Sequence, residues 1–148
     1  MAQPTVASFG KFIVQLGDGA SPEVFSAPCG FTERSLELKA DTNATQVPDC
    51  DNPDAPAWED KDVRTLSASI TGQGVMALEA LPTWRTWFFS ALPKNVRVRL
   101  NAPTGKNPGY YQGAAILTSL KHDSNIGEKC KLSVSIENTG AWTWVAGT

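Results

Sequence analysis

Short segments in which apolar and polar residues alternate run along most of the chain. The clearest is Val63–Gln73, whose apolar positions are Leu66, Ala68 and Ile70 and whose polar positions are Thr65, Ser67, Ser69 and Thr71. Successive side chains of a strand point to opposite faces of its sheet. The pattern therefore predicts a strand with one buried and one solvated face, ended by Gly72 and Gly74. Phe31–Lys39 and Asn95–Leu100 show the same alternation.

The 12 glycines and 10 prolines divide the chain into short runs, which is typical of strands joined by turns. Further strands are predicted at Lys11–Leu16, Tyr110–His122, Cys130–Asn138 and Ala141–Ala146, and Glu23–Ser26 could be a short hairpin partner of the first. A total of about seven strands with little helix predicts a mainly β fold, an antiparallel β-sandwich.

One segment, Ala77–Ala91, has helical periodicity. Its apolar residues recur at three- and four-residue spacing at Ala77, Leu81, Trp84, Phe88 and Ala91. Proline is tolerated only in the first turn of a helix, so Pro82 predicts a start near residue 80, and Pro93 ends the segment. We expect one α-helix that flanks the sandwich.

Between two predicted strands, Ala40–Asp62 shows almost no periodicity. It contains three prolines, and its only large hydrophobic residues are Val47 and Trp58. We expect a long acidic inter-strand loop over residues 40–62, because loops of this length in small domains are usually functional or disordered.

The overall formal charge of −2 hides a strong separation of charge along the sequence. Residues 41–62 hold seven acidic side chains and one basic side chain, whereas residues 63–148 carry a net charge of +5. The simple interpretation is a solvated acidic loop. The functional hypothesis is that the loop of one copy meets a basic surface of the next, because a head-to-tail contact of this kind generates rings or filaments.

The candidate contact residues between copies share this charge pattern or lie beside it. They are Asp41, Asp49, Asp51, Asp54, Trp58, Asp60, Asp62, Arg64, Arg97 and Arg99. Lys129 and Lys131 add to the basic surface.

The chain contains no arrangement of residues that indicates catalysis, a metal site or a cofactor. Its three cysteines form no CxxC pair, and His122 is its only histidine. The longest apolar runs, Val75–Leu78 and Trp87–Phe89, are too short to cross a bilayer, so no membrane insertion is expected. The nearly balanced charge argues against a globally basic nucleic-acid binder.

The order of parts resembles the tail tube proteins, or major tail proteins, of long-tailed bacteriophages and phage-like gene transfer agents. The resemblance is carried by KFIVQLGDGASPEVF, Cys29-Gly30-Phe31, SLEL before the acidic segment, VRTLSASITGQGV and the tryptophan-rich helical segment. It spans residues 10 to 140 approximately and implies a single tail-tube domain, 1–148, with an N-terminal arm at 1–9.

The resemblance also implies an assembly and its partners. Six copies form a ring with a continuous inner β-barrel, and stacked rings form the tail tube that conducts DNA into the host. The implied partners are the tape-measure protein, the tail tip or baseplate, the tail terminator and DNA in transit. The implied location is the virion tail, assembled in the bacterial host cytoplasm.

Such a tube needs a polar lumen, and the hydroxyl faces of two predicted strands meet this requirement. The candidate lumen residues are Thr65, Ser67, Ser69, Thr71, Ser133 and Ser135. Lys129 and Lys131 share the face of the last two and could bind phosphate, which conflicts with easy sliding of DNA. Ordinary solvent exposure explains the same alternation.

A second hypothesis is a β-sandwich binding module, for carbohydrate or protein, that does not polymerise. Trp142 and Trp144 lie on one strand face, either as a stacking platform or as part of the core. A small enzyme is a third class, for which no residue constellation is found.

Overall fold

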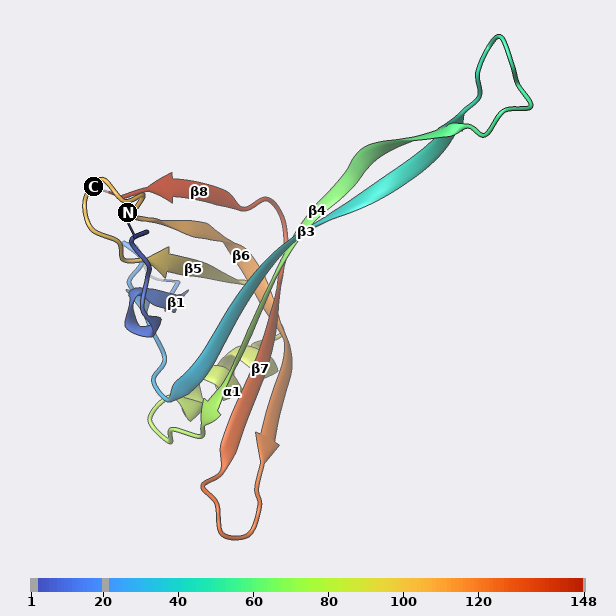
Figure 1. The fold of residues 1–148 in the computed structure, drawn as a ribbon. Helices are drawn as coiled ribbons and strands as arrows, with labels where there is room; N and C mark the ends of the chain where they lie inside the picture. Colours follow the sequence, from blue (N-terminus) through green and yellow to red (C-terminus); the bar gives the residue numbers. More distant parts are fainter. Residues whose placement is uncertain (1–2, 20–21, 148) are drawn as a thin grey trace.

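The strands of the chain form one continuous antiparallel sheet (Figure 1). The computed structural model describes residues 3–19 and 22–147. Its strands are β1 (Phe12–Gly17), β2 (Phe25–Ser26), β3 (Phe31–Val47), β4 (Trp58–Val75), β5 (Lys94–Leu100), β6 (Gly109–Asp123), β7 (Lys131–Asn138) and β8 (Thr143–Ala146). The α-helix of the described residues is α1 (Leu81–Ser90), and a 3-10 turn spans Phe9–Lys11. The mainly β, antiparallel architecture with one helix is confirmed.

Strand β6 belongs to two layers of this sheet. Its residues 109–115 pair with β5, and residues 109–112 also pair with β8 on the opposite edge. Residues 115–123 pair with β7. The first layer is therefore β3, β4, β7 and the second half of β6, and the second layer is β2, β1, β5, the first half of β6 and β8.

The hydrophobic core lies between the two layers and contacts α1. The core strands contribute Val14, Leu16, Ile70, Val96, Val98, Leu132, Val134 and Ile136. Trp84 and Trp87 of the helix are 1% and 2% exposed, and their rings stack with centroids 6.0 Å apart.

The helix begins and ends close to the predicted positions, but its buried stripe differs. Pro82 lies in the first turn, and Ala91 ends the helix in the left-handed conformation with φ 56°. The buried residues are Leu81, Trp84 and Trp87, whereas Phe88, predicted on the buried face, is 44% exposed.

The bounds expected for the long inter-strand loop, residues 40–62, are wrong. Strand β3 continues to Val47, β4 begins at Trp58, and their register ends with the pair Val47 and Trp58, so only residues 48–57 connect them. Residues 43–62 of the β3–β4 hairpin project from the body, and we call this part of the hairpin the arm (Figure 1). Both of its faces are exposed to solvent, so its strands carry none of the apolar alternation that reveals a half-buried strand.

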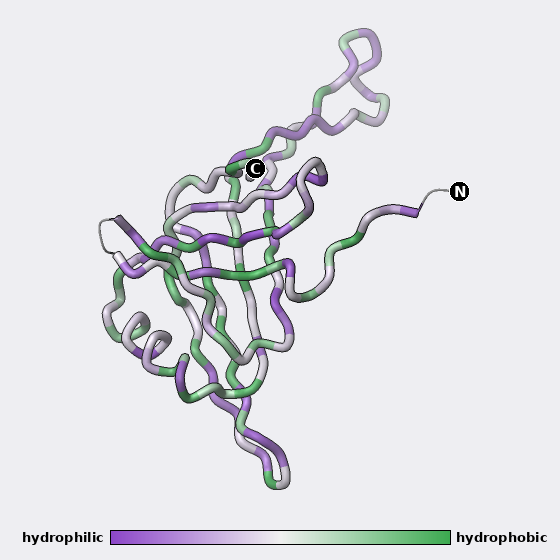
Figure 2. Tube along the Cα trace, turned by 90° about the vertical axis from the view of Figure 1, so that its left-hand side faces the viewer, coloured by the Kyte–Doolittle hydropathy of each residue, from purple (hydrophilic) through white to green (hydrophobic). Residues whose placement is uncertain are grey.

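The first described residues, from Gln3 on, leave the body as a separate extended segment (Figure 2). Met1 and Ala2 of the predicted N-terminal arm, and Thr148, lie outside the described residues. Arg34 holds the end of the N-terminal arm. Its guanidinium donates to the Phe9 carbonyl oxygen at 2.9 Å and stacks 4.1 Å from the Phe9 ring centroid.

Replacing Trp84 by alanine should lower the free energy of unfolding by about 3–5 kcal/mol, because a fully buried indole is removed from the core. Trp84→Phe should cost much less, since the Trp84 Nε1 has no hydrogen-bond partner among the described residues. Urea denaturation of the monomeric protein, followed by far-UV circular dichroism, measures both. Equal losses for the two variants would contradict this packing role.

Candidate assembly surfaces

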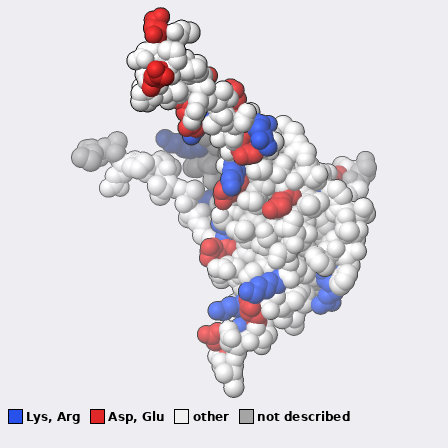
Figure 3. Space-filling model, turned by 90° about the vertical axis from the view of Figure 1, so that its right-hand side faces the viewer, with Lys and Arg blue, Asp and Glu red and all other residues white. Residues whose placement is uncertain are grey.

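The acidic residues of the arm lie at its far end and along its strands (Figure 3). Asp49, Asp51 and Asp54 occupy the connection between β3 and β4, where the Asp51 amide donates to Asp49 Oδ1 at 3.0 Å. Trp58 is 88% exposed beside them. The arm therefore presents an indole next to a concentrated negative charge.

At the base of the arm, acidic and basic candidates already meet within one chain. Arg64 is the extra residue of a bulge, because Asp41 pairs with Thr65 while Thr42 pairs with Val63. The Arg64 guanidinium lies 3.8 Å from the Asp41 carboxylate, and both side chains are more than 60% exposed. An exposed pair of this kind contributes little to stability.

Arg97 is fixed by its own chain. Its guanidinium carbon lies 3.9 Å from the Phe25 ring centroid and 4.5 Å from that of Tyr110, and its Nε donates to Gln112 Oε1 at 3.2 Å. Through these contacts Arg97 of β5 links β2, which carries Phe25, to β6, which carries Tyr110 and Gln112. Arg99 is less enclosed: its Nε donates to Asn101 Oδ1 at 3.1 Å, and its guanidinium carbon lies 5.6 Å from the Tyr110 centroid.

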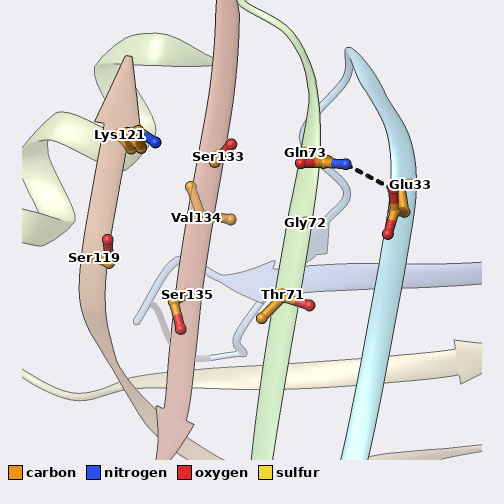
Figure 4. Close-up of a pocket in the computed structure, with 9 residues that line it drawn as sticks. All are labelled: Glu33, Thr71, Gly72, Gln73, Ser119, Lys121, Ser133, Val134 and Ser135. Carbon is orange, nitrogen blue, oxygen red and sulfur yellow. Dashed lines mark hydrogen bonds between the residues drawn. The ribbon is translucent and has the colours of Figure 1, made fainter. Parts of the chain in front are cut away.

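The polar candidates are brought together on one face of the first layer. Thr71 lies opposite Ser135 of β7 and Ser35 of β3, and Gln73 lies opposite Ser133. Thr65, Ser67 and Ser69 continue the same face along β4, because alternate residues of a strand share a face. Around Thr71 this face forms a shallow hollow of 220 Å³ (Figure 4).

The charged residues of this polar face are five carboxylates and three lysines, which leave it net negative. By register and alternation they are Glu33, Glu37, Lys39, Asp41, Lys121, Asp123, Lys131 and Glu137. Lys121 lies 3.8 Å from Asp123, and Lys131 lies 3.7 Å from Glu128. Lys129 is exposed in the connection between β6 and β7. The lysines of this face are therefore weaker phosphate ligands than the sequence alone indicates.

A second hollow, of 890 Å³, was not predicted. Leu38, Ala40 and Leu66 at the arm base line one side of it, and Trp142 and Trp144 line another. Leu66, predicted to be buried with Ala68 and Ile70, is 77% exposed, whereas those two are 5% and 2% exposed. The apolar face of the first layer thus extends beyond the second layer that would cover it.

The two tryptophans of this hollow have different environments. Trp142 packs against the core, and its Nε1 donates to the Ala114 carbonyl oxygen at 2.9 Å. Trp144 is 43% exposed and meets the Tyr111 ring edge-on at 4.8 Å.

Side chains that could bind a metal ion do not cluster in the described part of the chain. The described part of the chain has no group of three or more His, Cys, Asp or Glu side chains placed to hold a metal ion. Cys29 and Cys50 are exposed and Cys130 is partly buried, all three as free thiols. Within the described residues no helix has the length and apolarity needed to span a bilayer.

The comparisons with known proteins agree with this architecture. A family model described as phage tail tube protein matches residues 6–143, so the chain belongs to the phage tail tube protein family. It is a structural component of a phage-type tail tube. No curated protein sequence matches the chain.

Solved structures of tails share the fold. The tail of an empty gene transfer agent particle, refined with C6 symmetry, is 17% identical, with a TM-score of 0.77 over 95% of this chain and 100% of that one. The SPP1 tail tube is 8% identical, with a TM-score of 0.66 over 96% and 80%. The baseplate of the anti-feeding prophage, 6-fold symmetrised, is 12% identical, with a TM-score of 0.60 over 98% and 97%.

Arg97→Ala should lower the free energy of unfolding of the monomer by about 1–2 kcal/mol, because it removes two ring contacts and one hydrogen bond. Arg64→Ala is the matched control, and a change below about 0.5 kcal/mol is expected from its exposed ion pair. Urea denaturation separates the two. A larger loss of unfolding free energy for Arg64→Ala would show that the ion pair at the arm base, and not the contacts of Arg97, stabilises the body.

Proposed function

We propose that this chain assembles into stacked six-copy rings, which form the tail tube that conducts DNA into the host. Family membership and the six-fold tails that share its fold support this proposal. The observation that carries it is the pair of unpaired edges of the first layer. Electron microscopy of concentrated purified protein tests it: tubes or six-membered rings support assembly, and a monomer at all concentrations and salts overturns it.

The two edges of the first layer are suited to join between copies. Among the described residues β3 pairs only with β4, and residues 116–123 of β6 pair only with β7. Each neighbouring pair of these strands is antiparallel, so β3 and β6 run in opposite directions. The β3 edge of one copy can therefore add to the β6 edge of the next as an antiparallel pair. Repetition of this contact around an axis gives a closed barrel without exposed edges.

Exposed apolar surface lies where such a neighbour would sit. Leu38 of β3 and Leu66 of β4 are 55% and 77% exposed, at the edge that the next copy would extend. Contiguous exposed apolar surface on a monomer marks an interaction site. The hollow at the arm base is then completed by the adjoining copy.

The polar face of the first layer faces the lumen in this assembly. Its hydroxyl residues, Thr65, Ser67, Ser69, Thr71, Ser133 and Ser135, offer hydration without fixed positive charge. The paired lysines keep phosphate affinity low, which allows DNA to slide.

The remaining expectations follow from the same proposal. The tube surrounds the tape-measure protein, ends at a tail tip or baseplate and at a terminator protein, and lies in the virion tail after assembly in the host cytoplasm. It neither catalyses a reaction nor inserts into a membrane. A carbohydrate platform is less favoured, because Trp142 packs against the core and its indole N–H is already bonded to the Ala114 carbonyl oxygen.

Removal of the arm should abolish tubes while the body remains folded. Thr42 and Val63 are direct partners, so replacing Asn43–Asp62 by Asn-Gly closes a two-residue hairpin at this point. The removed residues contribute nothing to the core cluster. Far-UV circular dichroism should retain a cooperative unfolding transition, and electron microscopy should show no tubes. Loss of the folded state would show instead that the arm is part of the folding unit.

Labelling of cysteines in assembled tubes should identify the lumen. In a C29S/C50S/C130A background, Ser69→Cys should react with a small maleimide but be protected from a large PEG-maleimide that cannot enter the tube. Arg85→Cys on the exposed surface of α1 is the control, and it should react with both reagents. Equal reaction of both positions with the large reagent would exclude the hydroxyl face from the lumen.

A further inference from the structure

The end of the arm presents two large apolar side chains that the described residues leave exposed. We call residues 47–58 the arm tip. Val47 and Trp58 lie opposite each other where the hairpin strands end, and they are 51% and 88% exposed. Asp49, Asp51 and Asp54 follow in the connection between them. An exposed indole on a projecting hairpin is typical of an interface anchor.

A groove with the complementary character lies on the body, beside the C-terminal strand β8. This terminal groove, of 560 Å³, is formed by the loop between β5 and β6 and by the end of β8. Pro103, Pro108, Tyr110 and Val145 supply apolar walls. Lys11 and Arg99 lie among its lining residues, and none of the described residues that line it is acidic.

The cations of the terminal groove are available for a partner. Arg99 uses only its Nε in a hydrogen bond within the described residues, and Tyr110 lies under its guanidinium, which leaves the terminal nitrogens for a carboxylate. Lys106 is exposed in the adjoining loop. Opposite charges on the two surfaces favour their association in one register.

The arm tip of the same chain lies far from this groove (Figure 1). The arm projects away from the body on the side opposite the termini, beside which the groove lies (Figure 1). The hollow at the arm base fits an acidic tip less well, because its Arg64 is already paired with Asp41.

We propose that the arm tip of one copy seats in the terminal groove of another copy, with Trp58 as the apolar anchor and the tip carboxylates paired with Lys11, Arg99 and Lys106. This contact rests on the proposed assembly and identifies the partner surface of the arm. The two surfaces complement each other, since the apolar side chains of the tip are exposed and none of the described residues that line the groove is acidic.

Cys50 makes the contact testable, because it is an exposed thiol within the arm tip. In a C29S background, Lys106→Cys places a second thiol beside the groove. Lys129→Cys places one in the connection between β6 and β7 as the matched control. Tubes are first verified by electron microscopy, then treated with a short bis-maleimide and separated on a denaturing gel. We expect a ladder of covalent oligomers for Lys106→Cys and none for Lys129→Cys.

The outcomes separate the contact from the assembly. Tubes without a ladder for Lys106→Cys, or a ladder for Lys129→Cys instead, would overturn the contact and leave the tube function standing. Absence of tubes in the parent C29S protein would overturn both.

Charge and anchor variants provide a second measurement. Reversal of Asp49, Asp51 and Asp54 to lysine should reduce tube yield by about tenfold, and Lys106→Glu combined with Arg99→Glu in the same chain should restore it. Trp58→Ala should slow cross-linking in the Lys106→Cys background by a similar factor. Unchanged cross-linking in Trp58→Ala, or no rescue by the groove reversals, would contradict the assignment.

Discussion

The register between β4 and β7 is the constraint on which the rest of the molecule depends. It places Ile70 opposite Ile136, and the next pair is Thr71 opposite Ser135. The pair of isoleucines belongs to the core cluster that contains Trp84 and Trp87, and the pair of hydroxyl residues belongs to the hydrated face. A slip by one residue would exchange the two sets, placing hydroxyls in the core and isoleucines in water. The core therefore fixes the chemistry of the polar face.

The edges and the arm follow from the same layer. Because β3 and β4 are held in register with β7 over the body, they continue beyond it as a hairpin without a second layer to cover them. The layer ends at β3 on one side and at β6 on the other, so its unpaired backbone is located by the core packing. Such edges are a liability in a monomer, and assembly between copies uses them.

The elements predicted from the sequence are those with one buried and one exposed face. The elements that were missed are those whose two faces are both exposed. Val63–Gln73 and the segment around Trp84 were identified because burial imposes a period on them. The arm strands carry polar residues on both faces, so no period marked them. Gly72 and Gly74 were read as a strand end, yet both lie within β4, where a Cβ would clash with the Phe31 ring and the Gly30 carbonyl oxygen respectively.

The candidate site was predicted by residue type rather than by arrangement. The acidic cluster and the hydroxyl face are visible in composition and alternation, and the structure places each on one surface. The role of Arg97 was not visible, because its ring partners come from β2 and β6, which are distant in sequence. The ion pairs of Lys121 with Asp123 and of Lys131 with Glu128, by contrast, join residues only two and three positions apart in the sequence.

The charge of the arm also bears on which contacts are avoided. An exposed tryptophan at the end of a hairpin would favour association of two tips, an isologous contact that closes a dimer and stops growth. Three carboxylates in the same arm tip make that contact repulsive, whereas in the proposed contact a groove lined with Lys11 and Arg99 attracts the tip. The same side chains thus disfavour the dead-end dimer and favour the head-to-tail contact. A tube protein needs this bias, because it must remain dispersed until copies meet in the orientation that extends the tube.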